Sequence, residues 1–163
     1  MTNPVLARPF VRRDEEGDSL WFAGNLLTAK TSGQETGGRL SVIEFLNPPG
    51  YGTPLHRHTA EDEAFYVLSG TARVFCDGEE FEAGPGDFVL LPLGLPHTFI
   101  VGPHEPLRTL VITAPSGFEQ FVAAAGEPAS QRRLPDPGPI DPVALAQIAA
   151  EYGIETLGPP PHH

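Results

Sequence analysis

Short apolar runs separated by turn residues cover the chain from about residue 20 to residue 112. Residues 39–46, 71–76 and 107–113 are examples, and each run has the length of one strand. The Asp77-Gly78 pair between two runs predicts a hairpin, because its turn needs positive φ values that Asp and Gly tolerate. The regular spacing of the runs predicts an all-β fold, either a sandwich or a barrel.

Toward the C-terminal end the period changes and predicts two short helices. Residues 117–126 carry apolar positions at helical spacing, behind Ser116 and Glu119 at the spacing of a capping box. Residues 141–153 follow with Asp141 at the N-cap position. We therefore expect four parts, listed in chain order: an N-terminal arm (1–19), a barrel (20–115), a C-terminal helical extension (116–157) and a tail without function (158–163, with His162 and His163).

Length and charge narrow the class of protein. The 163 residues suit one domain with a full core. The formal net charge is -11 and Lys30 is the only lysine, so no basic stripe is available for phosphates. We expect no nucleic-acid partner and no binding to anionic membranes.

The cysteine count and the distribution of apolar residues predict the cellular compartment. Cys76 is the only cysteine, which fits a reducing compartment and a small core residue. The first twenty residues lack the apolar stretch of a secretory signal, and no segment has the roughly 18 apolar residues of a membrane span. We expect a cytoplasmic protein.

Two histidines stand one residue apart in the segment TPLHRHTAEDEAFYVLSG, residues 53–70. Alternate side chains of a strand point to the same face, so His56 and His58 are predicted to project into one space. Glu63 follows after an odd number of residues and rejoins that face only through a turn or bulge. Glu61 and Asp62, on the expected turn, are interpreted as exposed charges.

A second segment supplies another histidine. In GPGDFVLLPLGLPHTFIV, Gly86, Pro92 and Gly94 punctuate a strand and a tight turn, after which His97 starts a new strand. A barrel would bring His97 opposite the first three residues.

These two segments resemble the two motifs of the cupin superfamily. Gly50, His56, His58, Glu63 and Gly70 follow the first motif position by position. The second segment resembles the second motif, although a valine at position 101 stands where an asparagine is often found. The resemblance extends over roughly residues 40–112.

The resemblance implies an all-β fold, a double-stranded β-helix (jelly-roll) barrel with short C-terminal helices here, often assembled as a homodimer. It also implies that His56, His58, Glu63 and His97 bind one metal ion. Three imidazoles and one carboxylate suit Fe, Ni, Co, Mn, Cu or Zn as divalent ions, and the sequence does not choose among them. One carboxylate against a divalent ion leaves a charge of about +1, which favours an anionic ligand.

The strongest functional likeness is to small single-domain cupins of the quercetin 2,3-dioxygenase type. It implies an oxidoreductase in which a metal-bound enolate of a small phenolic or enolisable aromatic substrate reacts with O2, with Glu63 as the catalytic base. Phe65, Val67 and Phe99 are the predicted pocket residues. Two alternatives stay open: a metal-dependent isomerase or cyclase that needs no oxygen, and a non-catalytic cupin that binds a small ligand.

Overall fold

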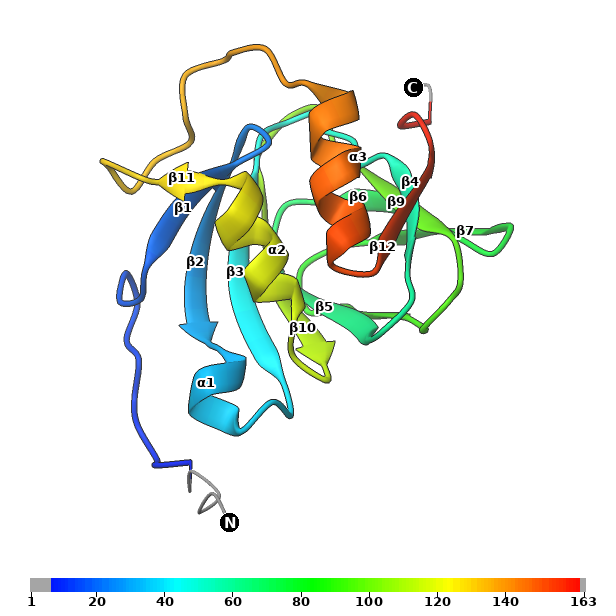
Figure 1. Cartoon of the computed structure of the whole chain (residues 1–163). Coiled ribbons are helices and arrows are strands. Elements are labelled where there is room, and N and C mark those ends of the chain that lie inside the picture. The colour runs from blue at the N-terminus through cyan, green and yellow to red at the C-terminus, as the bar shows by residue number, and fades with distance from the viewer. Residues whose placement is uncertain (1–6, 162–163) are drawn as a thin grey trace.

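The computed structural model describes residues 7–161, and its two antiparallel sheets confirm the predicted all-β double-sheet barrel (Figure 1). The elements in chain order are β1 (Ser19–Phe22), β2 (Asn25–Thr31), α1 (Gly33–Thr36), β3 (Ser41–Asn47), β4 (Leu55–His58), β5 (Asp62–Ser69), β6 (Ala72–Cys76), β7 (Glu79–Ala83), β8 (Phe88–Leu91), β9 (His97–Val101), β10 (Leu107–Ala114), α2 (Phe118–Ala125), β11 (Glu127–Pro128), α3 (Pro142–Glu151) and β12 (Ile154–Gly158).

The larger sheet has the strand order β11-β1-β2-β3-β10-β5-β8, and the smaller has the order β12-β4-β9-β6-β7. Some strands that follow one another in the chain lie in different sheets, as β4 and β5 do. Side chains alternate between the core and the outer surface: along β3 and β10 every second residue is buried. Residues on the inner faces of both sheets thus meet inside the barrel.

The hairpin predicted at Asp77-Gly78 joins β6 to β7. Asp77 has φ 49° and Gly78 has φ 81°, the two positive values that a tight hairpin turn requires. The turn fixes the register in which Cys76 pairs with Glu79.

Both predicted helices are present, although the first begins differently from the expectation. The N-cap of α2 is Gly117 and not Ser116. Glu119 accepts hydrogen bonds from the backbone N–H groups of Gly117 (2.7 Å) and Gly33 (2.8 Å), so its carboxylate caps α2 and ties the helix to the segment that begins α1. At α3 the prediction is confirmed, because Asp141 accepts hydrogen bonds from two N–H groups of the first turn.

The C-terminal region also contains strands that the sequence pattern did not predict. Strand β11 pairs with β1, and β12 pairs with β4, so the segment expected as a helical extension also adds a strand to each sheet. The chain divisions at residues 19, 115 and 157 stay predictions. His162 and His163 lie outside the described residues.

The helices cover part of the barrel interior. Phe121 of α2 packs edge-on against Phe22 with ring centroids 5.3 Å apart, and Phe118 stacks against Phe45 at 6.2 Å. In Figure 1, α2 and α3 lie side by side across one side of the barrel, with β12 returning beside α3. Within residues 7–161 no helix is long and apolar enough to span a membrane.

Two glycines with the same backbone conformation provide a test of packing in the barrel. Gly70 and Gly78 have φ values of 80° and 81°. A Cβ at Gly70 would clash with the carbonyl oxygen of Pro106, whereas at Gly78 it would meet nothing within 4 Å. We expect Gly78→Ala to lower the free energy of unfolding by about 1–2 kcal/mol, the cost of the left-handed conformation. Gly70→Ala should lower it by clearly more, and equal losses in urea unfolding would contradict the explanation.

Candidate metal centre

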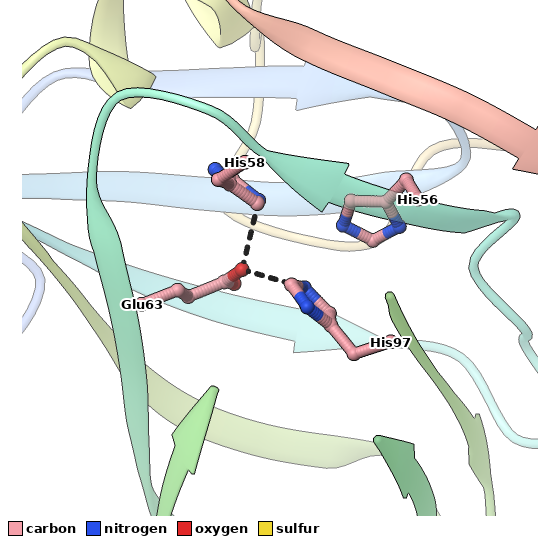
Figure 2. Close-up of side chains that lie close together, drawn as sticks. All are labelled: His56, His58, Glu63 and His97. Atoms are coloured by element: carbon pink, nitrogen blue, oxygen red, sulfur yellow. Dashed lines mark hydrogen bonds and ion pairs between the residues drawn. The ribbon is translucent and has the colours of Figure 1, made fainter. Parts of the chain in front are cut away.

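Four side chains from three strands meet between the sheets (Figure 2). His56 and His58 lie on β4, and the direct pairing of β4 with β9 places His97 beside His56. Glu63 comes from β5 in the other sheet, which it reaches through the turn that follows His58. The expectation that His97 lies opposite the other three was wrong: Glu63 is the residue from the opposing sheet.

The four groups are close enough to hold one metal ion. One potential ligand atom from each lies within 4.8 Å of all the others. Glu63 Oε2 lies 2.9 Å from His58 Nε2 and 3.1 Å from His97 Nε2, contacts drawn in Figure 2. His58 and His97 are almost completely buried, and Glu63 is nearly so.

Hydrogen bonds at Nδ1 fix the tautomers of His56 and His97. His56 Nδ1–H donates to the carbonyl of Pro54 (2.7 Å), and His97 Nδ1–H donates to that of Leu95 (3.1 Å). A carbonyl oxygen only accepts, so the proton of each neutral ring lies on Nδ1. The Nε2 lone pairs are therefore left for the centre of the cluster, the tautomer in which histidine binds a metal.

The inner atoms of the cluster fit a cation. An ionised Glu63 accepts hydrogen bonds but donates none, and it faces Nε2 atoms that are also acceptors in the neutral rings. Among the described residues, His58 Nε2 has no hydrogen-bond partner of good geometry, although Glu63 Oε2 is 2.9 Å away. Acceptors gathered in a buried space repel one another unless a proton or a metal ion lies among them. This orphaned nitrogen is the observation that makes the cluster suitable for a metal.

Without a metal, the cluster holds a proton on one histidine. Burial favours the neutral form of His58, but the negative charges of Glu63 and Glu61 outweigh it and raise its pKa to about 10. Burial, helped by repulsion from His97, lowers the pKa of His56 to about 4. Burial alone would raise the pKa of Glu63, but charged His58 holds it well below the ordinary value.

Glu61 was predicted as an exposed turn charge, and that prediction was wrong. Glu61 is only 3% exposed, and His58 Nδ1–H donates to Glu61 Oε1 over 2.8 Å. Asp62 is exposed as expected, and it accepts a hydrogen bond from Leu93 N–H. A second buried carboxylate, that of Glu61, therefore lies beside the cluster. A divalent ion together with Glu61 and Glu63 would have a formal charge of zero, and not the +1 expected from the sequence.

The cluster opens on a cavity of about 760 Å³ inside the barrel. Its aromatic wall consists of Phe22, Phe45, Tyr51, Phe65, Phe99, Phe118 and Phe121. Helix α3 and β12 form another part of the wall, through residues that include Leu145, Ala146 and Ile154. Among the lining residues there is no lysine and no arginine. The cavity is therefore apolar, with its charged groups gathered at the cluster.

Two of the three predicted pocket residues lie on this wall. Phe65 and Phe99 line the cavity with their rings 6.0 Å apart. Val67 does not line it: the side chain is 0% exposed and packed among core residues. The alternation along the strand predicted that Val67 points into the barrel. It did not predict whether the side chain contacts other core residues or lines the cavity. The contribution of α3 was not predicted at all.

A β-barrel of two antiparallel sheets with three histidines and a glutamate in its interior is an arrangement that could hold a metal ion. Comparison with known proteins agrees: residues 43–113 match the family model described as the cupin domain. The matched segment contains all four residues of the cluster and is similar to the cupin domain.

Individual relatives carry different activities. The chain is 30% identical to quercetin 2,3-dioxygenase of Bacillus subtilis (strain 168) over 154 residues, which is 94% of this chain and 44% of that protein. The polyketide cyclase RemF of Streptomyces resistomycificus is 26% identical, with a TM-score of 0.52 over 67% of this chain and 80% of that one. KdgF from Halomonas sp. is 18% identical, with a TM-score of 0.59 over 69% and 99%, and supports the fold alone. The chain spans less than half of the dioxygenase that it matches.

The pKa of His58 leads to a test of metal binding. Because that pKa is raised to about 10, the ring is protonated at neutral pH, and a metal ion must displace its proton. His56, with a pKa of about 4, is already neutral. We expect Zn²⁺ to release about one proton per ion near pH 7.5, and its affinity to rise about tenfold per pH unit between about pH 7 and pH 9. Calorimetry in buffers of different ionisation enthalpy measures the release, and binding without proton release would contradict the assignment.

Proposed function

We propose that the protein is a metal-dependent dioxygenase of the quercetinase type, acting on a small phenolic or enolisable aromatic compound. The observation that carries the proposal is that His56, His97 and Glu63 of the cluster open directly onto an apolar cavity walled by aromatic rings. The 30% identity to a quercetin 2,3-dioxygenase supports it.

The cavity favours aromatic over strongly anionic substrates. Its volume of about 760 Å³ lies in the range of about 300–1,000 Å³ typical of small-molecule sites. Phe and Tyr rings provide favourable surfaces for planar aromatic compounds. A phosphate or a free carboxylate would enter a lining without lysine or arginine, and would lose hydration without gaining an ion pair.

We propose that His56, His58, Glu63 and His97 hold one divalent transition metal. When bound, the metal would supply Lewis-acid chemistry that acidifies a substrate hydroxyl and, in quercetinase-like enzymes, permits reaction with dioxygen. Glu63 is the inner carboxylate of the cluster and would accept the hydroxyl proton. Helix α3 would shield the reacting substrate from water, because its side chains close part of the cavity.

Replacement of Glu63 tests its proposed role. Glu63→Gln keeps the shape of the side chain but removes the proton acceptor and the charge. With a flavonol as substrate, we expect oxygen uptake to fall by about 10²–10⁴-fold, the usual contribution of a general base. The metal content must be measured in parallel, since Glu63 is also a proposed ligand. Unchanged oxygen uptake by a metal-containing variant would remove Glu63 from the base role.

Two alanines of α3 provide a matched test of the cavity as the substrate site. Ala144 and Ala146 are both half-buried, but only Ala146 lines the cavity. We expect Ala146→Trp to weaken flavonol binding at least about tenfold by filling the space, while Zn²⁺ affinity stays the same. Ala144→Trp should leave flavonol binding close to that of the wild type. Similar binding by both variants, measured by fluorescence titration, would contradict the assignment.

A second candidate is a metal-dependent cyclase or isomerase that needs no oxygen. The 26% identity and the TM-score of 0.52 with a polyketide cyclase favour it. The same Glu63 would serve as the base. Turnover of an aromatic polyketide or a flavonol under strict exclusion of oxygen would support this candidate over the dioxygenase.

A further inference from the structure

Glu61 is a buried carboxylate that is neither one of the four proposed metal ligands nor a participant in the proposed reaction. It lies in the turn between β4 and β5, two residues before Glu63, and its residue is 3% exposed. A buried carboxylate is costly unless its charge is compensated. The hydrogen bond from His58 Nδ1–H, 2.8 Å long, provides the compensation.

The turn that carries Glu61 is anchored on both sides. Thr59 N–H and Thr59 Oγ1 both donate to the carbonyl of Gly153, 2.9 Å and 2.7 Å away. Gly94 N–H donates to the carbonyl of His58 over 2.8 Å. These bonds hold the two residues that lead into the turn, and after Glu61 the pairing of Asp62 with Ala114 holds the start of β5. The Glu61 carboxylate therefore meets His58 without a search through many conformers.

His58 differs from the other two histidines in the partner of its outer nitrogen. His56 and His97 donate to neutral backbone carbonyls, whereas His58 donates to a charged side chain. A carboxylate partner orients a metal-binding imidazole, fixes its tautomer and increases its basicity more than a carbonyl does. Phe118 of α2 also packs against the His58 ring, with centroids 5.5 Å apart, and restricts its rotation.

We propose that Glu61 is a positioning residue for the metal centre: it holds His58 with the proton on Nδ1, so that Nε2 is presented to the ion, and its charge makes His58 the strongest of the three imidazole donors. The proposal rests on metal binding, one part of the proposed function, and not on the reaction that follows.

Zn²⁺ affinity, measured by competition with a chromophoric chelator, tests this role without substrate or oxygen. Glu61→Ala is expected to lose about 10–100-fold in affinity, the usual effect of removing such a partner. Glu61→Gln keeps an oxygen that accepts the hydrogen bond but lacks the charge, so its loss should be smaller, roughly three- to tenfold. Glu82→Gln, at an exposed glutamate of β7, is the matched control and should bind Zn²⁺ like the wild type.

A second readout reports on the ring itself. In the Zn²⁺-loaded wild type, long-range ¹H–¹⁵N spectra should show His58 protonated at Nδ1, with a downfield proton from its bond to the carboxylate. Glu61→Gln should move this resonance upfield and leave those of His56 and His97 in place. A purely structural role for Glu61 would not single out one imidazole.

Several results would overturn the proposal. Affinities within threefold of the wild type for folded Glu61→Ala, or an equal loss in Glu82→Gln, would do so. Should Glu61→Ala fail to fold, wild-type affinity in Glu61→Gln or a wild-type His58 without a proton on Nδ1 would overturn it. Because none of these measurements involves a flavonol or oxygen, a failure of the dioxygenase proposal would leave them unaffected.

Discussion

In the neutral imidazole rings the inner nitrogens are hydrogen-bond acceptors, and they converge with the Glu63 carboxylate between the two sheets, so the cluster favours a proton or a metal ion among them. Backbone carbonyls and Glu61 keep the outer imidazole nitrogens protonated, so the inner nitrogens meet the carboxylate of Glu63 as acceptors. A proton on His58 satisfies the cluster in part, since it neutralises one of the two buried carboxylates. A divalent ion satisfies it better, because it balances both. The negative charges of Glu61 and Glu63 thus favour a divalent ion at this position.

The arrangement of strands would leave a metal ion at the cluster accessible to a small molecule in the cavity. Two sheets contribute ligands, so the centre lies between them and not on one surface. The space beyond it is filled by aromatic rings spaced loosely enough to leave a cavity, with α3 across part of its wall. An ion in this position is both shielded from bulk water and open to an apolar ligand, the combination that Lewis-acid chemistry on a phenolic compound needs.

Local spacing predicted an all-β fold and both helices, and the resemblance to the cupin motifs implied the barrel and the four clustered side chains. His56 and His58 share a face by strand periodicity, and a turn returns Glu63 to them as expected. The sequence did not predict the role of Glu61, since a glutamate beside two other acidic residues gives no sign of which one turns inward. A clue was available: Glu61 lies three residues after His58, within reach across a tight turn. Val67 was wrongly predicted to line the pocket, because side-chain packing leaves no periodic signal in the sequence. Strand β12 was not predicted, because its pairing with β4 joins segments that are far apart in the chain.

The pairing of β12 with β4 makes the C-terminal segment part of the site's own scaffold. In the smaller sheet β4 is an interior strand only because β12 lies beyond it, with Ile154 opposite His58 and Thr156 opposite His56. A chain shortened before residue 154 would turn the histidine-bearing strand into an open edge. Its unpaired amides and carbonyls would then offer a template for strands of other molecules, so β12 protects the strand that carries His56 and His58 against aggregation.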